Sequence, residues 1–151
     1  MKYLFLSIAI IVSIFSIAAP AQTDEKDAAR VPLENYIKGH ATGDGSYMRK
    51  AFHTDGNLIF IREGKYTTRS FADYIGGFTG KPAADEAGRK RSIESIDVAG
   101  NAGSAKIILD YPTIRFVDYM SLLKIDGEWK IVNKIFYAEP KTKPVETGIK
   151  Q

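Results

Sequence analysis

The sequence contains no cysteine, and this absence excludes several classes of protein. Without a thiol there is no disulfide framework, no cysteine nucleophile and no lipoprotein anchor, so the fold must depend on its apolar core. Only two histidines occur among the 151 residues, and no third clear ligand accompanies them. We therefore predict no metal site and no cofactor.

A large excess of one charge is also missing. The formal net charge is +3, or +2 without residues 1–21, whose one charged side chain is Lys2. Nucleic-acid binding needs a dense basic stripe, so we predict no nucleic-acid partner. The one basic run, Arg89-Lys90-Arg91, is interpreted as a solvated entrance to a strand. Gly80-Lys81-Pro82 lacks the spacing of a phosphate-binding loop.

The one long apolar run is at the N-terminus, in MKYLFLSIAIIVSIFSIAAPA, residues 1–21. It follows Lys2 and ends in Ala19-Pro20-Ala21, which is the pattern of a cleavable signal peptide. We predict cleavage before Gln22, a periplasmic or secreted protein, and no membrane association after cleavage. The alternative is an uncleaved anchor, although three serines dilute the run.

Helical spacing is found in three segments. The first runs from Thr23 to about Thr42, where Pro32 predicts either a kink or a helix that begins near this proline. The second is a short helix over residues 47–52, which Ser46 can cap. The third begins at about Ser70 and ends at the glycines that follow Ile75.

The remaining pattern is typical of strands. Strands are predicted over residues 57–62, 65–68, 90–99 and 102–111, and then in a long hairpin over residues 113–138; residues 53–56 are predicted to be a turn. One domain is expected over residues 22–138. The polar tail, residues 139–151, is expected to be disordered.

The long hairpin closes at Asp126-Gly127, a dipeptide that favours a type I′ turn. If Ile125 pairs with Glu128, Asp118 and Asn133 lie on one face, and Lys134 lies on the other unless a bulge intervenes. Both faces are substantially apolar. We therefore expect helices to cover one face and a second copy of the chain to cover the other, as a homodimer through the outer sheet face.

The order of elements predicts an α+β fold, with a cone-shaped, curved antiparallel sheet wrapped around N-terminal helices. Such a cone has an open mouth. A concave, mostly apolar space of this kind is typical of a small-ligand pocket.

Three segments carry a resemblance to a known family: LENYIKGHATGDGSYMRKAFHTDGNL at 33–58, RSIESIDVAGNAGSAKI at 91–107, and FVDYMSLLKIDGEWKIVNKIF at 116–136. They resemble the lumazine-binding family of the nuclear transport factor 2-like superfamily, which has a cystatin-like fold. The superfamily also contains the SnoaL-like polyketide cyclases and ketosteroid isomerase. The likeness covers almost the whole chain after residue 21, and it is specific for fold rather than for function.

The comparison with ketosteroid isomerase implies particular roles. That enzyme holds an oxyanion with a tyrosine of its first helix and a protonated carboxylic acid on a late strand. Tyr36 matches the tyrosine, and Asp118 lies within about one residue of the acid. The position of the general base, however, is occupied by Phe60. The resemblance therefore implies a retained pair without the base that proton abstraction needs.

Three candidates have alternative interpretations. His40 shares a helix face with Tyr36 and can enter the pocket as a base or a donor, or it can simply bond backbone near the helix end. Asp118, in an apolar strand, must be paired or protonated; it is either functional or a strand-edge carboxylate that meets a lysine. His53-Thr54-Asp55 has the spacing of a metal half-site, but a turn is the preferred interpretation.

We predict an exported protein that binds a small, partly apolar molecule. The predicted ligand-binding residues are Tyr36, His40, Phe60, Phe78, Phe116, Asp118 and Asn133. The alternative is an isomerase, cyclase or dehydratase that uses Tyr36, His40 and Asp118. A third interpretation is a structural dimer whose cavity is filled by side chains.

Overall fold

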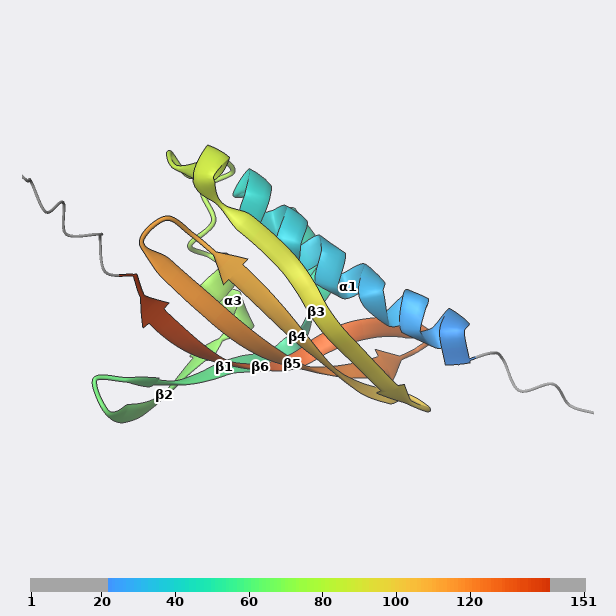
Figure 1. Ribbon diagram of the computed structural model, residues 1–151. Helices are drawn as coiled ribbons and strands as arrows, with labels where there is room; N and C mark the ends of the chain where they lie inside the picture. Colours follow the sequence, from blue (N-terminus) through green and yellow to red (C-terminus); the bar gives the residue numbers. More distant parts are fainter. Residues whose placement is uncertain (1–21, 142–151) are drawn as a thin grey trace, which may run out of the picture.

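Within residues 22–141, which the computed structural model describes, a long helix lies across one face of a curved sheet (Figure 1). The helices are α1 (Gln22–Thr42), α2 (Gly45–Ala51), α3 (Phe71–Ile75) and a 3-10 turn, η1 (Glu86–Gly88). The strands are β1 (Phe52–Arg62), β2 (Lys65–Ser70), β3 (Lys90–Ala99), β4 (Ala102–Asp110), β5 (Ile114–Ile125) and β6 (Glu128–Pro140). The predicted signal peptide and the end of the predicted tail lie outside the described residues.

The strands form one sheet in the order β2-β1-β6-β5-β4-β3. Every neighbouring pair is antiparallel except β1 and β6, which are parallel. The predicted α+β class, with N-terminal helices packed against a curved sheet, is confirmed. The prediction of an antiparallel sheet is wrong for one pair, β1 and β6, which are the first and last strands of the chain.

Helix α1 begins at Gln22, one residue before the predicted Thr23, and it continues through Pro32, so the alternative of a helix that begins near this proline is excluded. The predicted cap of the second helix is wrong. The cap of α2 is Asp44 rather than Ser46, because the Asp44 carboxylate accepts a hydrogen bond of 2.7 Å from the Ser46 backbone N–H. Helix α3 follows Ser70 as predicted, and the Ser70 hydroxyl accepts from the Asp73 N–H at 3.0 Å.

Residues 53–56 belong to β1 and not to a turn. The β1–β6 pairing is irregular there, because Phe52 pairs with Ile131 and the next pair is Asn57 with Asn133. Gly56 is buried inside this irregular stretch, where a Cβ atom would lie 2.1 Å from the Phe71 ring. A side chain is therefore excluded at this position. At the other end of the sheet, β6 reaches Pro140, so Glu139 and Pro140 are not part of a disordered tail.

The long hairpin has the predicted turn. Asp126 and Gly127 both have positive φ angles, 50° and 86°, and Ile125 pairs with Glu128. This register continues to the pair of Leu122 with Ile131, but the next pair is Ser121 with Asn133. Val132 is thus an extra residue in β6, which is a β-bulge.

The bulge reverses the faces of the second half of β6. Met120 pairs with Lys134, so Lys134 points to the same face as Asp118, while Asn133 points to the opposite face. The placement counted from the turn without a bulge is therefore wrong for both residues, and the alternative of a bulge that brings Lys134 to the face of Asp118 is the one observed. A shift of one residue is sufficient, because successive side chains of a strand alternate between faces.

The core lies between α1 and the concave face of the sheet. Ala29, Leu33 and Tyr36 of α1 are fully buried. The N-terminal part of α1 is held by Glu25, whose carboxylate accepts hydrogen bonds from Trp129 at 3.0 Å and from Lys124 at 2.6 Å. The concave face contributes Ile96, Val98, Ile107, Leu109, Met120, Leu122 and Ile131, all buried.

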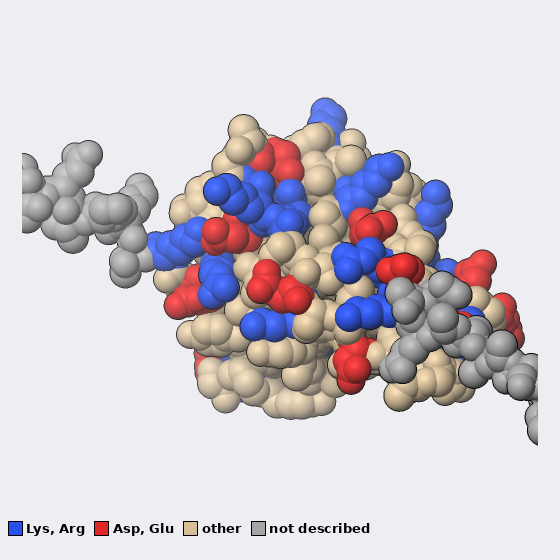
Figure 2. Space-filling model, turned by 45° about the vertical axis from the view of Figure 1, so that its right-hand side comes forward, with Lys and Arg blue, Asp and Glu red and all other residues tan. Residues whose placement is uncertain are grey.

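The outer face of the sheet carries exposed apolar side chains. These are Ile61, Tyr66, Tyr119, Leu123, Ile135 and Tyr137. In the view of Figure 2, Lys and Arg side chains are interspersed with Asp and Glu, so the described residues form no extended surface of one sign on that side. None of the helices between residues 22 and 141 combines the length and apolarity that membrane crossing requires.

Candidate functional site

Asp118 lies on the concave face of β5 and has no exposed surface. Its Oδ2 atom accepts a hydrogen bond of 2.6 Å from the hydroxyl of Tyr36 and one of 3.1 Å from the ammonium group of Lys134. Its Oδ1 atom is buried and has no hydrogen-bond partner among the described residues. Asp118 is therefore paired with a lysine, as one interpretation of the sequence held, but inside the molecule and not at a strand edge.

Lys134 reaches this network because of the bulge at Val132. Only 4% of the residue is exposed, and its Nζ atom donates to the Tyr36 hydroxyl at 2.9 Å as well as to Asp118. An ammonium group has three N–H donors, so one remains beyond these two bonds. The Lys134 Nζ also lies 4.7 Å from the centroid of the Phe136 ring.

Burial determines the electrostatics of this network. It lowers the pKa of Lys134, and the neighbouring Asp118 carboxylate offsets part of this change. Burial raises the pKa of Tyr36 well above its ordinary value, and the Asp118 charge raises it further. Tyr36 therefore stays protonated and acts as a relay, because its hydroxyl accepts from Lys134 and donates to Asp118.

A second pair lies beside the first. The Tyr74 hydroxyl is 2.8 Å from Nε2 of His40, and the His40 ring packs edge-on against Tyr36 with 4.7 Å between centroids. Burial lowers the pKa of His40 well below its usual value, and the positive charges of Lys134 and Arg91 lower it further. His40 is therefore neutral at neutral pH. It bonds a side chain and not the backbone partner that was considered from the sequence.

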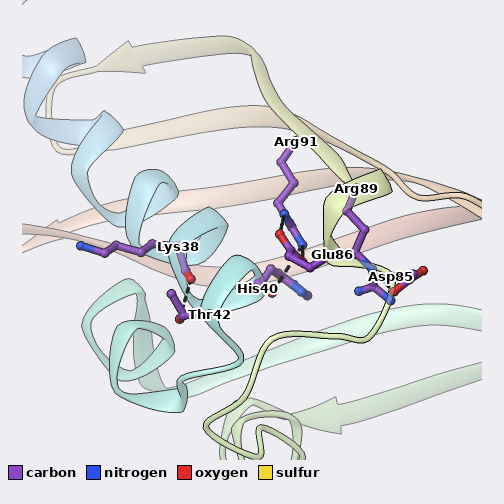
Figure 3. Close-up of polar contacts among 7 residues, drawn as sticks. All are labelled: Lys38, His40, Thr42, Asp85, Glu86, Arg89 and Arg91. Carbon is purple, nitrogen blue, oxygen red and sulfur yellow. Dashed lines mark hydrogen bonds and ion pairs between the residues drawn. The ribbon is translucent and has the colours of Figure 1, made fainter.

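Arg91, near the start of β3, links the end of α1 to the loop before that strand (Figure 3). Arg91 donates to both oxygens of Glu86, at 2.6 and 2.7 Å, and also to the backbone carbonyl of His40 at 3.4 Å. Arg89 donates to Asp85 at 2.8 Å. The interpretation of this basic run as solvated is wrong for Arg91, whose side chain is 6% exposed. The Arg91 contacts therefore hold the end of α1, which carries His40.

A cavity of about 520 Å³ opens above the Lys134 amine, at one end of the concave face. Its walls are largely aromatic, and its rim is cationic. The lining includes His40, Leu58, Phe60, Arg62, Arg69, Tyr74, Arg89, Leu109, Tyr111, Phe116, Lys134 and Phe136. The described side chains thus leave open space in the cone, which disfavours the interpretation of a filled cavity.

The predicted site residues fall into three groups. His40, Phe60 and Phe116 line the cavity. Tyr36 and Asp118 lie behind Lys134 and contact the cavity only through that amine, while the ring of Phe78 packs against His40 at 5.6 Å. Asn133 is placed elsewhere, because it faces outward and its side-chain amide donates to the Asn57 carbonyl at 3.2 Å.

Several lining residues were not predicted. Lys134 was placed on the outer face, and nothing in the sequence marks Val132 as a bulge. Arg62 and Arg69 occupy inward-facing positions of β1 and β2. Because every second residue of a strand faces the same side, the inward position of Arg62 could have been predicted from that of Phe60. The remaining candidate pair, His53 and Asp55, makes a local contact in β1, and residues 22–141 contain no group of three potential metal ligands.

Comparisons with known proteins show the family of the chain and structures with a similar fold. The sequence profile of the family described as "Putative lumazine-binding" matches residues 24–137. The chain belongs to this family. A crystal structure of an NTF2-like protein of unknown function from Shewanella baltica OS155 is 28% identical with a TM-score of 0.73, and covers 82% of this chain and 100% of its own. Another, from Methylobacillus flagellatus KT, is 27% identical with a TM-score of 0.67, covering 82% and 98%.

One curated relative of this lumazine-binding family member has a named activity. It is the aldolase FrzH of Cladobotryum sp, which is 21% identical over 119 residues, 79% of this chain and 95% of the relative. The family and the NTF2-like neighbours place the chain in the NTF2-like superfamily and indicate the binding of a small molecule.

Proposed function

We propose that this protein is an exported carrier or receptor of a small, partly aromatic molecule, which it binds in the cavity above Lys134. The observation that carries the proposal is an aromatic-walled space of about 520 Å³ whose floor is a buried amine. Cavities of this size and composition are typical of small-molecule sites. The Lys134 amine retains one donor, and His40 and Tyr74 add a second polar pair on the wall.

The floor is preorganised for a polar group. Lys134 is held by Tyr36 and Asp118, so its amine cannot swing away when a ligand enters. A ligand carbonyl or hydroxyl that accepts the remaining N–H of Lys134 would meet a fixed donor in a dry environment, where a hydrogen bond is stronger than in water. The aromatic walls supply the apolar contact area.

The test begins with native mass spectrometry of the protein purified from the compartment to which it is exported. A discrete adduct that disappears on denaturation identifies the ligand. Phe116→Arg then places a charged side chain in the cavity, and Asn101→Arg adds the same side chain to the exposed β3–β4 turn as a control. We expect the first variant to lose the adduct and the second to keep it. Unchanged binding by Phe116→Arg would contradict the proposal.

Export and dimerisation are part of the proposal. Cleavage before Gln22 predicts that the exported protein begins at this residue, and N-terminal sequencing that finds Met1 would refute it. A second copy is the proposed cover of the outer face, supported by exposed Tyr119, Ile135 and Tyr137. Ile135→Lys should convert the dimer to a monomer in light scattering; a wild-type monomer at micromolar concentration would exclude this interface.

A second candidate is an enzyme, and the neutral His40 favours it. An imidazole that is unprotonated at neutral pH can accept a proton, and its lowered pKa makes His40 a weaker base than a free histidine. The removal of a proton beside a carbonyl is the step that aldol and isomerase chemistry share. The name of the aldolase relative agrees with this class. Deuterium exchange into the α-carbons of phenylacetone should then be catalysed and lost in His40→Asn. Equal exchange by both proteins would refute catalysis by His40.

A further inference from the structure

The lining of the cavity is strongly cationic. Four of its lining side chains are basic, namely Arg62, Arg69, Arg89 and Lys134, and none of the lining residues that the structure describes is acidic. Positive charges gathered in this way repel one another and raise the free energy of the empty protein. Binding of an uncharged molecule would not relieve this repulsion.

Two of the four charges are already compensated within the protein. Lys134 is paired with Asp118 at 3.1 Å, and Arg89 with Asp85 at 2.8 Å, as Figure 3 shows for the second pair. Arg62 and Arg69 differ from these. Among residues 22–141, no carboxylate lies within 4.0 Å of either guanidinium group. These two arginines are therefore the groups whose charge is available to a ligand.

Their position relative to the walls is also informative. The Arg62 guanidinium lies 5.4 Å from the ring centroid of Phe60, and that of Arg69 lies 5.7 Å from Tyr74. Both rings line the cavity. Stacking of this kind orients a guanidinium group. The Nη2 atom of Arg69 also donates to the backbone carbonyl of Asp73, so its remaining N–H groups are the ones left for an oxyanion. The strands β1 and β2 pair antiparallel, with Arg62 opposite Lys65 and Leu58 opposite Arg69, so both arginines belong to one hairpin.

Deeper in the cavity, the aromatic rings form a continuous wall. The ring centroids of Phe60 and Phe136 are 4.8 Å apart, and those of Phe116 and Phe136 are 6.0 Å apart. A planar ring can pack against this wall, while a group attached to it projects toward the hairpin. The arrangement thus separates an apolar, ring-binding part from an anion-binding rim.

We propose that the ligand is an aromatic molecule that carries an oxyanion, namely a carboxylate, sulfonate or phosphate group, which Arg62 and Arg69 bind at the rim while the ring lies against Phe60, Phe116 and Phe136. This assignment rests on the proposed function, since it names the chemical class of molecule that the cavity holds. Arginine suits the role because its planar fork can donate two parallel hydrogen bonds to one oxyanion.

The test uses two matched fluorescent probes: anilinonaphthalene sulfonate, and phenylnaphthylamine, which has the same rings without the sulfonate. Each is titrated into the wild-type protein and into the variant Arg62→Gln/Arg69→Gln. The control, Arg49→Gln/Lys50→Gln, removes two charges from exposed residues of α2 that do not line the cavity. An unfolding midpoint measured for each variant ensures that a folded protein is compared.

We expect the sulfonate to bind the wild type at least about tenfold more tightly than the neutral probe, since charge-assisted hydrogen bonds are the stronger ones. This preference should disappear in the Arg62→Gln/Arg69→Gln variant and persist in the control, with the affinity for the neutral probe unchanged. Added salt should weaken binding of the sulfonate only.

The outcomes separate this inference from the proposed function. Equal binding of both probes, abolished by Phe116→Arg, would overturn the oxyanion assignment but leave a small-molecule cavity. Binding of the neutral probe that survives Phe116→Arg takes place outside the cavity and would overturn the proposed function. A sulfonate preference that the control variant also loses would mean that general charge, and not the hairpin arginines, is responsible, which again overturns the assignment.

Discussion

The buried pair of Lys134 and Asp118 allows a sharp test of how the sheet is constructed. Lys134→Met keeps a long unbranched side chain, so it creates little empty volume, and it removes the charge together with the hydrogen bonds to Tyr36 and Asp118. What it leaves is a carboxylate with no exposed surface and no counter-charge. Breaking a buried pair in this way costs about 3–5 kcal/mol of the free energy of unfolding.

This magnitude is large for a domain of this size. With a urea dependence of about 1.5 kcal/mol per molar, the midpoint should move down by about 2–3 M. The matched control is Lys130→Met, on the same strand. Lys130 pairs with Glu128 at 2.9 Å, but the Glu128 side chain is 73% exposed. A surface pair of this kind contributes about 0–1 kcal/mol, so the control should change the midpoint little.

A double-mutant cycle identifies the source of the loss. Asp118→Asn retains an oxygen that accepts from Tyr36, but it leaves Lys134 without its counter-charge. The double variant Asp118→Asn/Lys134→Met contains neither charge. We expect it to lose less stability than the sum of the two single variants, by about 2–3 kcal/mol. If Lys134→Met changes the midpoint no more than Lys130→Met does, Lys134 is solvated and the bulge does not place it inside the cone.

Two other predictions concern His40 and Gly56. The folded chain holds the pKa of His40 well below 6.5, so the unfolded chain binds more protons between that lowered pKa and pH 6.5. The free energy of unfolding should therefore fall as the pH is lowered below 6.5, by up to about 1.4 kcal/mol per pH unit, and His40→Asn should remove this part of the slope in urea titrations; an unchanged slope would contradict the burial of the ring. Gly56→Ala would place a Cβ atom 2.1 Å from Phe71, so thermal unfolding should report a loss of about 1–3 kcal/mol. Gly76→Ala, whose Cβ atom would lie 3.4 Å from the nearest carbonyl oxygen, is the control, and equal losses in both variants would refute this account.

The sequence by itself determined most of the elements and their order. Strand β3 occupies the predicted residues, because alternating apolar side chains and glycine turns are local signals. The turn at Asp126-Gly127 is equally local, since that dipeptide adopts positive φ angles at low cost. Tyr36 and Asp118 were also predicted to act together, and they share a hydrogen bond of 2.6 Å.

Tertiary structure decided which side chains face the cavity. The bulge at Val132 depends on how β6 pairs with β5 on one side and with β1 on the other, and no residue near Val132 signals it. That single extra residue moves Lys134 inward and Asn133 outward. It therefore changes the floor of the site from an isolated acid to an ion pair, which a register counted from the turn alone could not predict.

The charges at the rim were decided in the same way. Arg62 and Arg69 are seven residues apart in the chain and become neighbours of one cavity only when β1 and β2 pair and the sheet curves around α1. Arg89 has an acid four residues away in the chain, Asp85, whereas the pairing of β5 with β6 brings Asp118 to Lys134. Among the described residues, the two hairpin arginines are left without an acid. Local pattern thus specifies the strands, whereas contacts between residues distant in sequence specify the charge that a ligand meets.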